Sequence, residues 1–196
     1  PPFQPQRHQH DVEFQKQVLN TFYGIDLDKT PPKLAEAFIQ LEDQSKRTAP
    51  KTTPLWLSKA FLDLSETGKG DVVLDPAAGY GNILRKASAR GADAHGVEVN
   101  INAVNSAIFL NELIGSNISY TAGDYLKFPQ RAHSLPTEFD QVFIDPPFNL
   151  HYEKPDGTLA RNGDEKFVRD SLERLKPGGR LTVILPIGKL YKRKAS

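Results

Sequence analysis

The spacing of hydrophobic residues changes character about a third of the way along the chain. Over residues 11–44, and again over residues 55–64, apolar side chains recur every three or four positions, which predicts short helices. The first ten residues are rich in proline and glutamine and show no such period, so we expect a loose tail there. The expected apolar face of the second helical stretch consists of Leu55, Trp56, Ala60, Phe61 and Leu64.

Beyond residue 70 the apolar residues form short continuous runs separated by helical stretches. Runs that alternate with helices in this way are typical of parallel strands joined by crossover helices. The pattern predicts an α/β fold with a doubly wound, mainly parallel sheet, and two parts of the chain: an N-terminal tail and helical extension over residues 1–50, and a catalytic domain over residues 51–196. The expected strands cover residues 72–74, 94–99, 118–121, 141–144 and 180–185.

The composition is that of a globular domain, and it excludes some kinds of catalysis and binding site. Of 196 residues, 38% are hydrophobic and 25% are charged, with a net charge of +1. No apolar run is long enough to span a bilayer, and no signal segment opens the chain, so we expect no membrane partner and a cytoplasmic location. Cysteine is absent, which excludes thiol catalysis, disulfides and thiolate zinc sites.

The histidines do not fall at metal-ligand spacing, so we expect no bound metal. We predict surface or loop positions for His8, His10, His95, His133 and His151. The chain also lacks methionine and opens on Pro1, which gives the expectation that it is a piece of something longer.

The first predicted strand leads into a turn with two glycines. Asp75 ends the apolar run, and Gly79 and Gly81 follow before a helix expected from about Ile83. Glycines let the backbone approach a ligand closely, and a helix N-terminus offers unpaired N–H groups. An ordinary strand-to-helix turn would show the same glycines, so the turn alone is weak evidence for a ligand site.

Acidic residues follow the next two strands. Glu98 comes about twenty positions beyond the glycine turn, where a carboxylate can accept hydrogen bonds from both ribose hydroxyls. Asp124, after Gly123 at the end of the third strand, is placed to meet the amine of an adenine ring. A solvated glutamate and an aspartate that caps the next turn are the plainer alternatives. Together these residues predict a nucleoside pocket, with a nicotinamide dinucleotide as the rival ligand.

The most specific motif is Asp145-Pro146-Pro147-Phe148, which follows the fourth strand. Two prolines stiffen the backbone and donate no hydrogen bonds, so their carbonyls stay available as acceptors. An exocyclic amine held by the Asp145 side chain and the Pro146 carbonyl would become pyramidal, which frees its lone pair, while Phe148 stacks on the planar group. Residues 152–164 lack periodicity and predict a mobile loop over the substrate.

In this order the motifs resemble amino-methyltransferases, and the closest resemblance is to the adenine-N6 DNA methyltransferases of the gamma arrangement, such as the modification subunits of type I restriction systems. The likeness covers residues 51–190 and includes a Thr-Pro element before the glycine turn. It implies a Rossmann-like fold that uses S-adenosyl-L-methionine. By this resemblance the target amine is held by Asp145, Pro146, Pro147 and Phe148, and the cofactor by Thr53, Pro54, Asp75, Ala77, Gly79, Gly81, Glu98, Val99, Gly123, Asp124 and Asp145.

The chain departs from the family in two respects. The family has seven strands and the pattern here stops after the fifth, so we expect a truncated sheet. No segment resembles a target-recognition domain, so a specificity subunit, a further domain or an additional chain segment is expected to supply recognition. A bacterial or phage-encoded origin is favoured by the resemblance.

Three alternatives stay open. Ribosomal RNA guanine-N2 methyltransferases and protein glutamine methyltransferases share an acid-Pro-Pro-Phe motif, and a non-catalytic cofactor-binding subunit would keep the pocket without the reaction. The intact target motif argues for activity. DNA is favoured over RNA because the Pro76-Ala77-Ala78 version of the turn looks more like the DNA enzymes.

Overall fold

A computed structural model describes residues 53, 55–127, 135–147, 150–154 and 156–185 of the chain. The expected N-terminal extension over residues 1–50 lies outside the described residues, as do Pro54 and Phe148. Within the described part of the chain, no helix has both the length and the apolar character needed to cross a bilayer.

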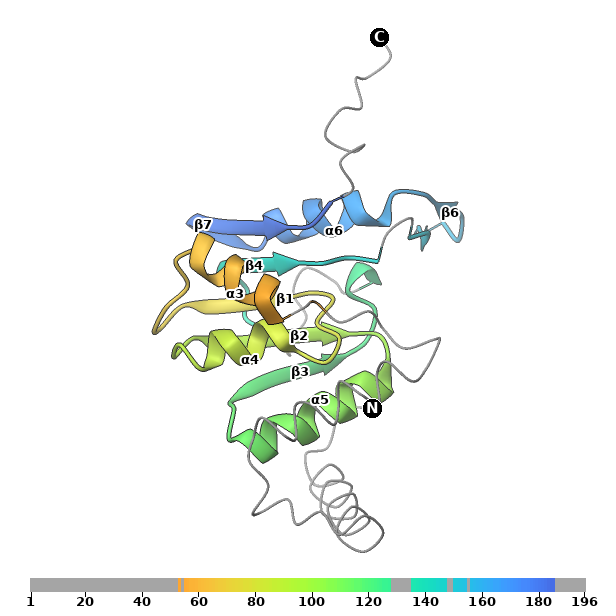
Figure 1. The fold of residues 1–196 in the computed structure, drawn as a ribbon. Helices are drawn as coiled ribbons and strands as arrows, with labels where there is room; N and C mark the ends of the chain where they lie inside the picture. Colours follow the sequence, from red (N-terminus) through yellow and green to blue (C-terminus); the bar gives the residue numbers. More distant parts are fainter. Residues whose placement is uncertain (1–52, 54, 128–134, 148–149, 155, 186–196) are drawn as a thin grey trace, which may run out of the picture.

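Five parallel strands form the main sheet, in the order β3-β2-β1-β4-β7 (Figure 1). This confirms the predicted doubly wound, mainly parallel sheet and its five strands. Because the strands run in one direction, their carboxyl ends lie at one edge of the sheet, where open α/β folds bind ligands. The strands are β1 (Val72–Asp75), β2 (Asp93–Glu98), β3 (Ile118–Ala122), β4 (Phe139–Ile144) and β7 (Leu175–Val183).

Strand β7 begins five residues earlier than its apolar run predicts. Leu175 pairs with Phe139, and the next paired residue of β7 is Arg180, opposite Gln141. Residues 176–179 therefore bulge out between two paired stretches of the same strand. A Lys-Pro-Gly-Gly sequence normally indicates a turn, but here it accommodates the extra residues of a bulge.

Helices cover both faces of the sheet, and each face has its own apolar core. On one face α3 (Leu55–Leu64) and α4 (Asn82–Ser88) pack against β1 and β4, while α6 (Gly163–Leu172) lies on the other face. Helix α5 (Ile101–Ile114) lies along β3 (Figure 1). The two cores follow from strand geometry, since Val73 and Leu74 are neighbours in β1 but point to opposite faces.

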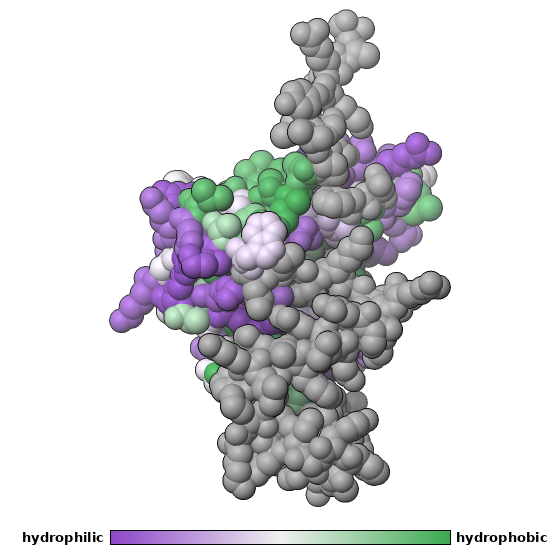
Figure 2. All heavy atoms as spheres, viewed as in Figure 1, coloured by the Kyte–Doolittle hydropathy of each residue, from purple (hydrophilic) through white to green (hydrophobic). Residues whose placement is uncertain are grey.

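Helix α3 buries a different face from the one expected. Phe61 is buried as predicted, but Trp56 is 72% exposed and Leu64 is 77% exposed, so the prediction was wrong for these two residues. The buried face instead contains Ser58 and Leu62, each fully inaccessible to solvent. Because serine is small, the helix can pack close to its neighbours at Ser58. Hydrophobic surface remains exposed beside α3, on the β7 side of the molecule (Figure 2).

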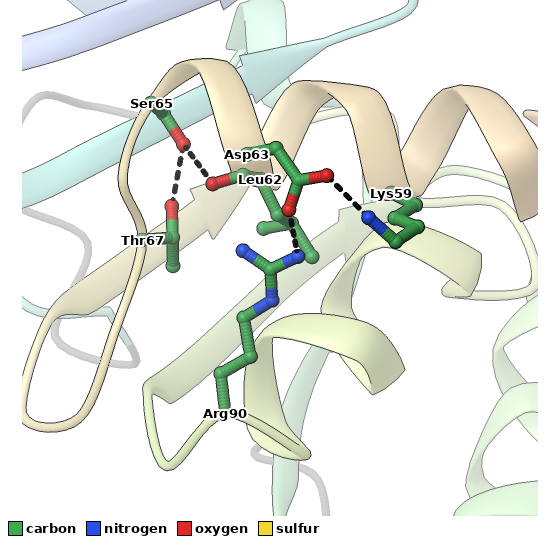
Figure 3. A network of polar contacts seen from close by, with 6 residues as sticks. All are labelled: Lys59, Leu62, Asp63, Ser65, Thr67 and Arg90. Atoms are coloured by element: carbon green, nitrogen blue, oxygen red, sulfur yellow. Dashed lines mark hydrogen bonds and ion pairs between the residues drawn. The ribbon is translucent and has the colours of Figure 1, made fainter.

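A polar network holds the carboxyl-terminal end of α3 (Figure 3). Asp63 accepts hydrogen bonds from Lys59, one turn earlier, and from Arg90, which follows α4. These two cations hold the pKa of Asp63 below its usual range. Beyond the helix end, the hydroxyls of Ser65 and Thr67 are hydrogen-bonded to each other at 2.6 Å. Exposed ion pairs add little stability, so the network mainly fixes where α3 ends relative to α4.

The segment expected to be a mobile loop after the target motif has regular structure. Strands β5 (Tyr152–Glu153) and β6 (Leu159–Ala160) form an antiparallel hairpin, and Gly163 already belongs to α6. Gly157 has a φ of 81°, which a turn between two such short strands requires. Strands of two residues are too short to show an alternating pattern in the sequence.

His95 is inside the fold, contrary to the expectation of a surface or loop position. It lies in β2 with 8% of its surface exposed. Its ring meets Phe139 edge to face, with 6.1 Å between ring centroids, and its Nε2 lies 3.1 Å from the Asp93 carboxylate. A histidine within a central strand packs as an aromatic core residue whatever its polarity.

The close approach of α4 to β2 depends on Gly96. A Cβ at this position would lie 2.7 Å from Cδ1 of Leu84 and 2.9 Å from Cβ of Ala78. Gly96→Ala should therefore force α4 away from the sheet and lower the free energy of unfolding by about 1–3 kcal/mol, measured by urea denaturation. Gly68→Ala is the matched control, because the nearest atom to its added Cβ would be 4.0 Å away. Equal stability of both variants would contradict this account of the packing.

Candidate active site

The carboxyl edge of the sheet opens into a cavity of 660 Å³, within the range of small-molecule sites. Segments that follow β1, β2, β3 and β4 meet there, although they are far apart in the sequence. The structure thus brings most of the predicted site residues together. Those that line the cavity are Ala77, Gly79, Glu98, Val99, Gly123, Asp124, Asp145, Pro146 and Pro147.

Three predicted site residues do not line the cavity. Asp75 is 3% exposed and accepts the Ala77 N–H at 3.0 Å. Gly81 precedes α4 with a φ of 80°, and a Cβ there would lie 1.8 Å from the Tyr120 hydroxyl. Thr53 bonds to Asp145, which lines the cavity, and to Asn82, which does not. Asp75 and Thr53 thus contact residues that line the cavity through hydrogen bonds, and Gly81 packs closely against Tyr120.

The glycine turn leaves the floor of the cavity bare. Gly79 has a φ of 52°, a conformation that L side chains rarely adopt, and no atom lies within 4 Å of the place where a Cβ would be. Its N–H donates to Oε2 of Glu98 at 2.9 Å. The turn is therefore fixed in place, while a ligand can approach its backbone.

Glu98 is tied to the backbone through both oxygens. Besides Gly79, the N–H of Asn100 donates to it, to Oε1 at 2.7 Å. Each carboxylate oxygen has more than one acceptor direction, so these bonds orient the group and leave acceptor capacity towards the cavity. Next to it Val99 is 72% exposed, an apolar side chain at the edge of a ligand site.

Asp124 caps the next turn, the plainer of the two roles considered for it, and also lines the cavity. Its Oδ1 accepts the N–H of Leu126 at 3.0 Å and so caps the short 3-10 helix η1 (Tyr125–Lys127). Asp124 and Gly123 also line the cavity. The capping bond uses one oxygen and fixes the side chain beside the pocket.

The double-proline corner forms another part of the cavity wall, after β4, which pairs with β1. It continues directly from β4, with Pro146 buried and Pro147 exposed. Asp145 stands at the start of the corner, and its Oδ2 accepts the Thr53 hydroxyl at 2.8 Å. Since neither proline has an N–H, the groups that the corner offers to a ligand are acceptors.

Several residues that line the cavity do not belong to any of the sequence motifs. Tyr152 begins the hairpin, and the Nζ of Lys166 lies 5.7 Å from the centre of its ring. Tyr125 and Phe167 stack with centroids 5.5 Å apart. Proximity to the target motif could have indicated the residues at 150–152, but nothing in the sequence marks Phe167, which reaches the site from α6. The additional residues are Tyr125, Leu126, Leu150, His151, Tyr152 and Phe167.

The site concentrates negative charge. Burial raises the pKa of Asp75 to about 7; the Ala77 N–H bond lowers this pKa, and the neighbouring carboxylates of Asp145 and Glu98 raise it further. Carboxylates that influence one another in this way favour a ligand that carries positive charge.

The fold is that of the class I S-adenosylmethionine-dependent methyltransferases. A protein assigned to that class from Listeria monocytogenes has a TM-score of 0.70 at 19% identity, over 94% of this chain and 66% of that one. The type I restriction-modification methyltransferase subunit from Streptococcus thermophilus has a TM-score of 0.64 at 23% identity, over 84% of this chain and 41% of that one.

The chain belongs to the N-6 DNA methylase family, which it matches over residues 36–196. A curated relative from Methanothermococcus thermolithotrophicus, assigned as a tRNA (guanine(10)-N2)-dimethyltransferase, is 28% identical over 131 residues. The match covers 64% of this chain and 76% of that protein. The chain spans 37% of the length of another curated relative.

The residues present fit S-adenosyl-L-methionine, the cofactor of this class. The bare glycine floor admits a ligand to the backbone, and the acidic lining suits a cofactor that carries a sulfonium cation. Glu98 and Asp124 offer carboxylate acceptors, which match hydroxyl and amine donors of a nucleoside. The exposed Val99 offers an apolar surface for a purine ring.

The pKa of Asp75 predicts a pH-dependent stability. Between about pH 4 and pH 7 the unfolded chain carries an ionised Asp75 while the folded chain keeps the proton, so the free energy of unfolding falls as the pH rises through this window. We expect wild type to lose about 1–4 kcal/mol more than Asp75→Asn between pH 4 and pH 8, in urea titrations without cofactor. Identical pH profiles for the two proteins would contradict this prediction.

Proposed function

We propose that this chain is the catalytic unit of an amino-methyltransferase that acts on the N6 amine of adenine in DNA. The observation that carries the proposal is that the Asp145-Pro146-Pro147 corner and the glycine turn line the same cavity. An amine held at one wall would thus face a cofactor held at the other. Membership of the N-6 DNA methylase family supports the same substrate.

On the cofactor side, each residue has a role that its position supports. Glu98 would accept hydrogen bonds from the ribose hydroxyls, and Asp124 would accept one from the adenine amine of the cofactor. Val99 would pack against that ring. Beneath them, Asp75 and the Gly79 turn would face the methionine part, where a cationic ligand would favour the ionised form of Asp75.

On the target side, the corner would make the amine a better nucleophile. Asp145 would accept one N–H and the Pro146 carbonyl the other, which favours a pyramidal nitrogen with its lone pair directed into the cavity. When bound, S-adenosylmethionine supplies a methyl group on an electrophilic sulfonium. As the nitrogen would bond to this carbon, the carbon–sulfur bond would break and leave its electron pair on the sulfur. The nitrogen would also lose a proton, which Asp145 would accept. Phe148 would stack on the target ring, as its motif position predicts.

RNA is the second candidate substrate. The relative assigned as a tRNA guanine-N2 dimethyltransferase supports it, because the amine of guanine would need the same two acceptors. For either nucleic acid, we propose that a specificity subunit, a further domain or an additional chain segment supplies target recognition.

The acceptor can be identified directly. The protein is incubated with methyl-labelled S-adenosylmethionine and, separately, with unmethylated duplex DNA, transfer RNA, ribosomal RNA and protein. Label in N6-methyladenine of the DNA is the expected result. Label in N2-methylguanine or in a glutamine amide would show that RNA or protein, and not DNA, is the substrate. Cofactor binding without any transfer would indicate a non-catalytic subunit.

Removal of the target acid tests the chemistry. Asp145→Ala should abolish methyl transfer and leave the cofactor dissociation constant, measured by calorimetry, within about tenfold of wild type, because the side chain acts on the amine. Asp63→Ala is the control, since this aspartate lies at the far end of α3 from Thr53 and its side chain accepts hydrogen bonds from Lys59 and Arg90, which do not line the cavity. Wild-type turnover in Asp145→Ala would refute the assignment.

A further inference from the structure

Thr53 contacts Asp145, the acid proposed to hold the target amine. Its hydroxyl donates to Oδ2 of Asp145 at 2.8 Å, although the two residues are 92 positions apart in the sequence. Thr53 does not line the cavity. The resemblance places it on the cofactor, whereas in the structure its hydroxyl bonds to the carboxylate that faces the target.

Thr53 is itself held by the first residue of α4. The carbonyl of Thr53 accepts a hydrogen bond from Nδ2 of Asn82 at 2.9 Å. Asn82 is 5% exposed and follows directly after Gly81 of the glycine turn. The residue that contacts the target acid is thus anchored to the element that forms the cofactor floor.

A buried arginine fixes the orientation of this link. Arg85 is 5% exposed, and its guanidinium donates to Oδ1 of Asn82 and to the carbonyl of Tyr80. A guanidinium can only donate, so the amide oxygen of Asn82 must face Arg85 and its NH₂ group must face Thr53. The hydrogen bonds therefore have one possible direction, from Arg85 through Asn82 to Thr53.

We propose that Thr53 is a positioning residue for Asp145, held in place from the glycine turn by Asn82 and Arg85. A carboxylate rotates about a single bond, and the Thr53 hydroxyl restricts this rotation by holding Oδ2. Oδ1 is then left as the acceptor for the target amine. This inference rests on the proposed function, which gives Asp145 that acceptor role. It means that the helix carrying the cofactor turn also aligns the target acid.

Two substitutions at Thr53 distinguish the effect of its hydroxyl donor from the effect of its side-chain shape. Thr53→Val keeps the shape and removes the donor, while Thr53→Ser keeps the donor. With labelled S-adenosylmethionine and unmethylated duplex DNA, kcat of Thr53→Val should fall roughly 10- to 100-fold, because a small misplacement of a catalytic group is costly. Its cofactor dissociation constant should stay within about twofold of wild type, and Thr53→Ser should retain most of the turnover.

Two results would overturn the inference. One is an unchanged kcat in Thr53→Val. The other is a cofactor dissociation constant raised by about tenfold or more with normal kcat at saturating cofactor, because Thr53 would then act as a cofactor contact. Asn82→Asp gives a second test, since it still accepts from Arg85 but cannot donate to Thr53; it should lower kcat in the same way.

Thr67→Val controls for general loss of stability. Thr67 is buried at the other end of α3, where its hydroxyl bonds to Ser65 (Figure 3). This variant should lose stability with no change in kcat. If it loses as much turnover as Thr53→Val, the effect comes from weakened folding and the inference fails.

A structural measurement keeps this inference separate from the proposed function. In a crystal structure of Thr53→Val with S-adenosylhomocysteine, the Asp145 carboxylate should leave the position it has in wild type; an unmoved carboxylate would refute the positioning role. An active Asp145→Ala would instead refute the proposed function. A dead Asp145→Ala beside a fully active Thr53→Val would refute this inference alone.

Discussion

The structure depends on one constraint: five parallel strands end at the same edge of a sheet. Four of the strands supply a carboxylate at or just after this edge that faces or underlies one cavity: Asp75, Glu98, Asp124 and Asp145. Gathering negative charge in a partly buried site is unfavourable in itself. Backbone N–H groups compensate at Asp75 and Glu98, and the Thr53 hydroxyl does so at Asp145. The same cluster makes the site receptive to a cation.

Close packing beneath the cavity is the second requirement. Helix α4 can approach β2 only because Gly96 has no side chain, and the Tyr120 ring reaches under the turn only because Gly81 has none. Into this space Arg85 inserts its guanidinium and bonds to the turn itself. The floor of the cofactor site is thus a rigid unit of strand, turn and helix, which suits a site whose ligand must be held at a fixed distance from its target.

The glycine turn and the proline corner, which line one cavity, are also connected by hydrogen bonds. Through Asn82 and Thr53, the helix after the glycine turn reaches the acid of the proline corner. A methyl transfer requires donor and acceptor atoms in line, and a small error in alignment slows it strongly. These hydrogen bonds do not depend on a bound target, so they would keep the turn and the corner in a constant relative position before any nucleic acid binds.

The sequence by itself determined the parallel sheet, its five strands, the glycine turn and the carboxylates at the strand ends, because short apolar runs and turn residues depend on local chemistry. It gave the wrong buried face for α3 at Trp56 and Leu64, and missed the hairpin at residues 152–160, since helix rotation and two-residue strands are decided by what packs against them. Only the tertiary structure brought Thr53 to Asp145 across 92 positions, because a hydrogen bond between distant residues leaves no local pattern in the chain.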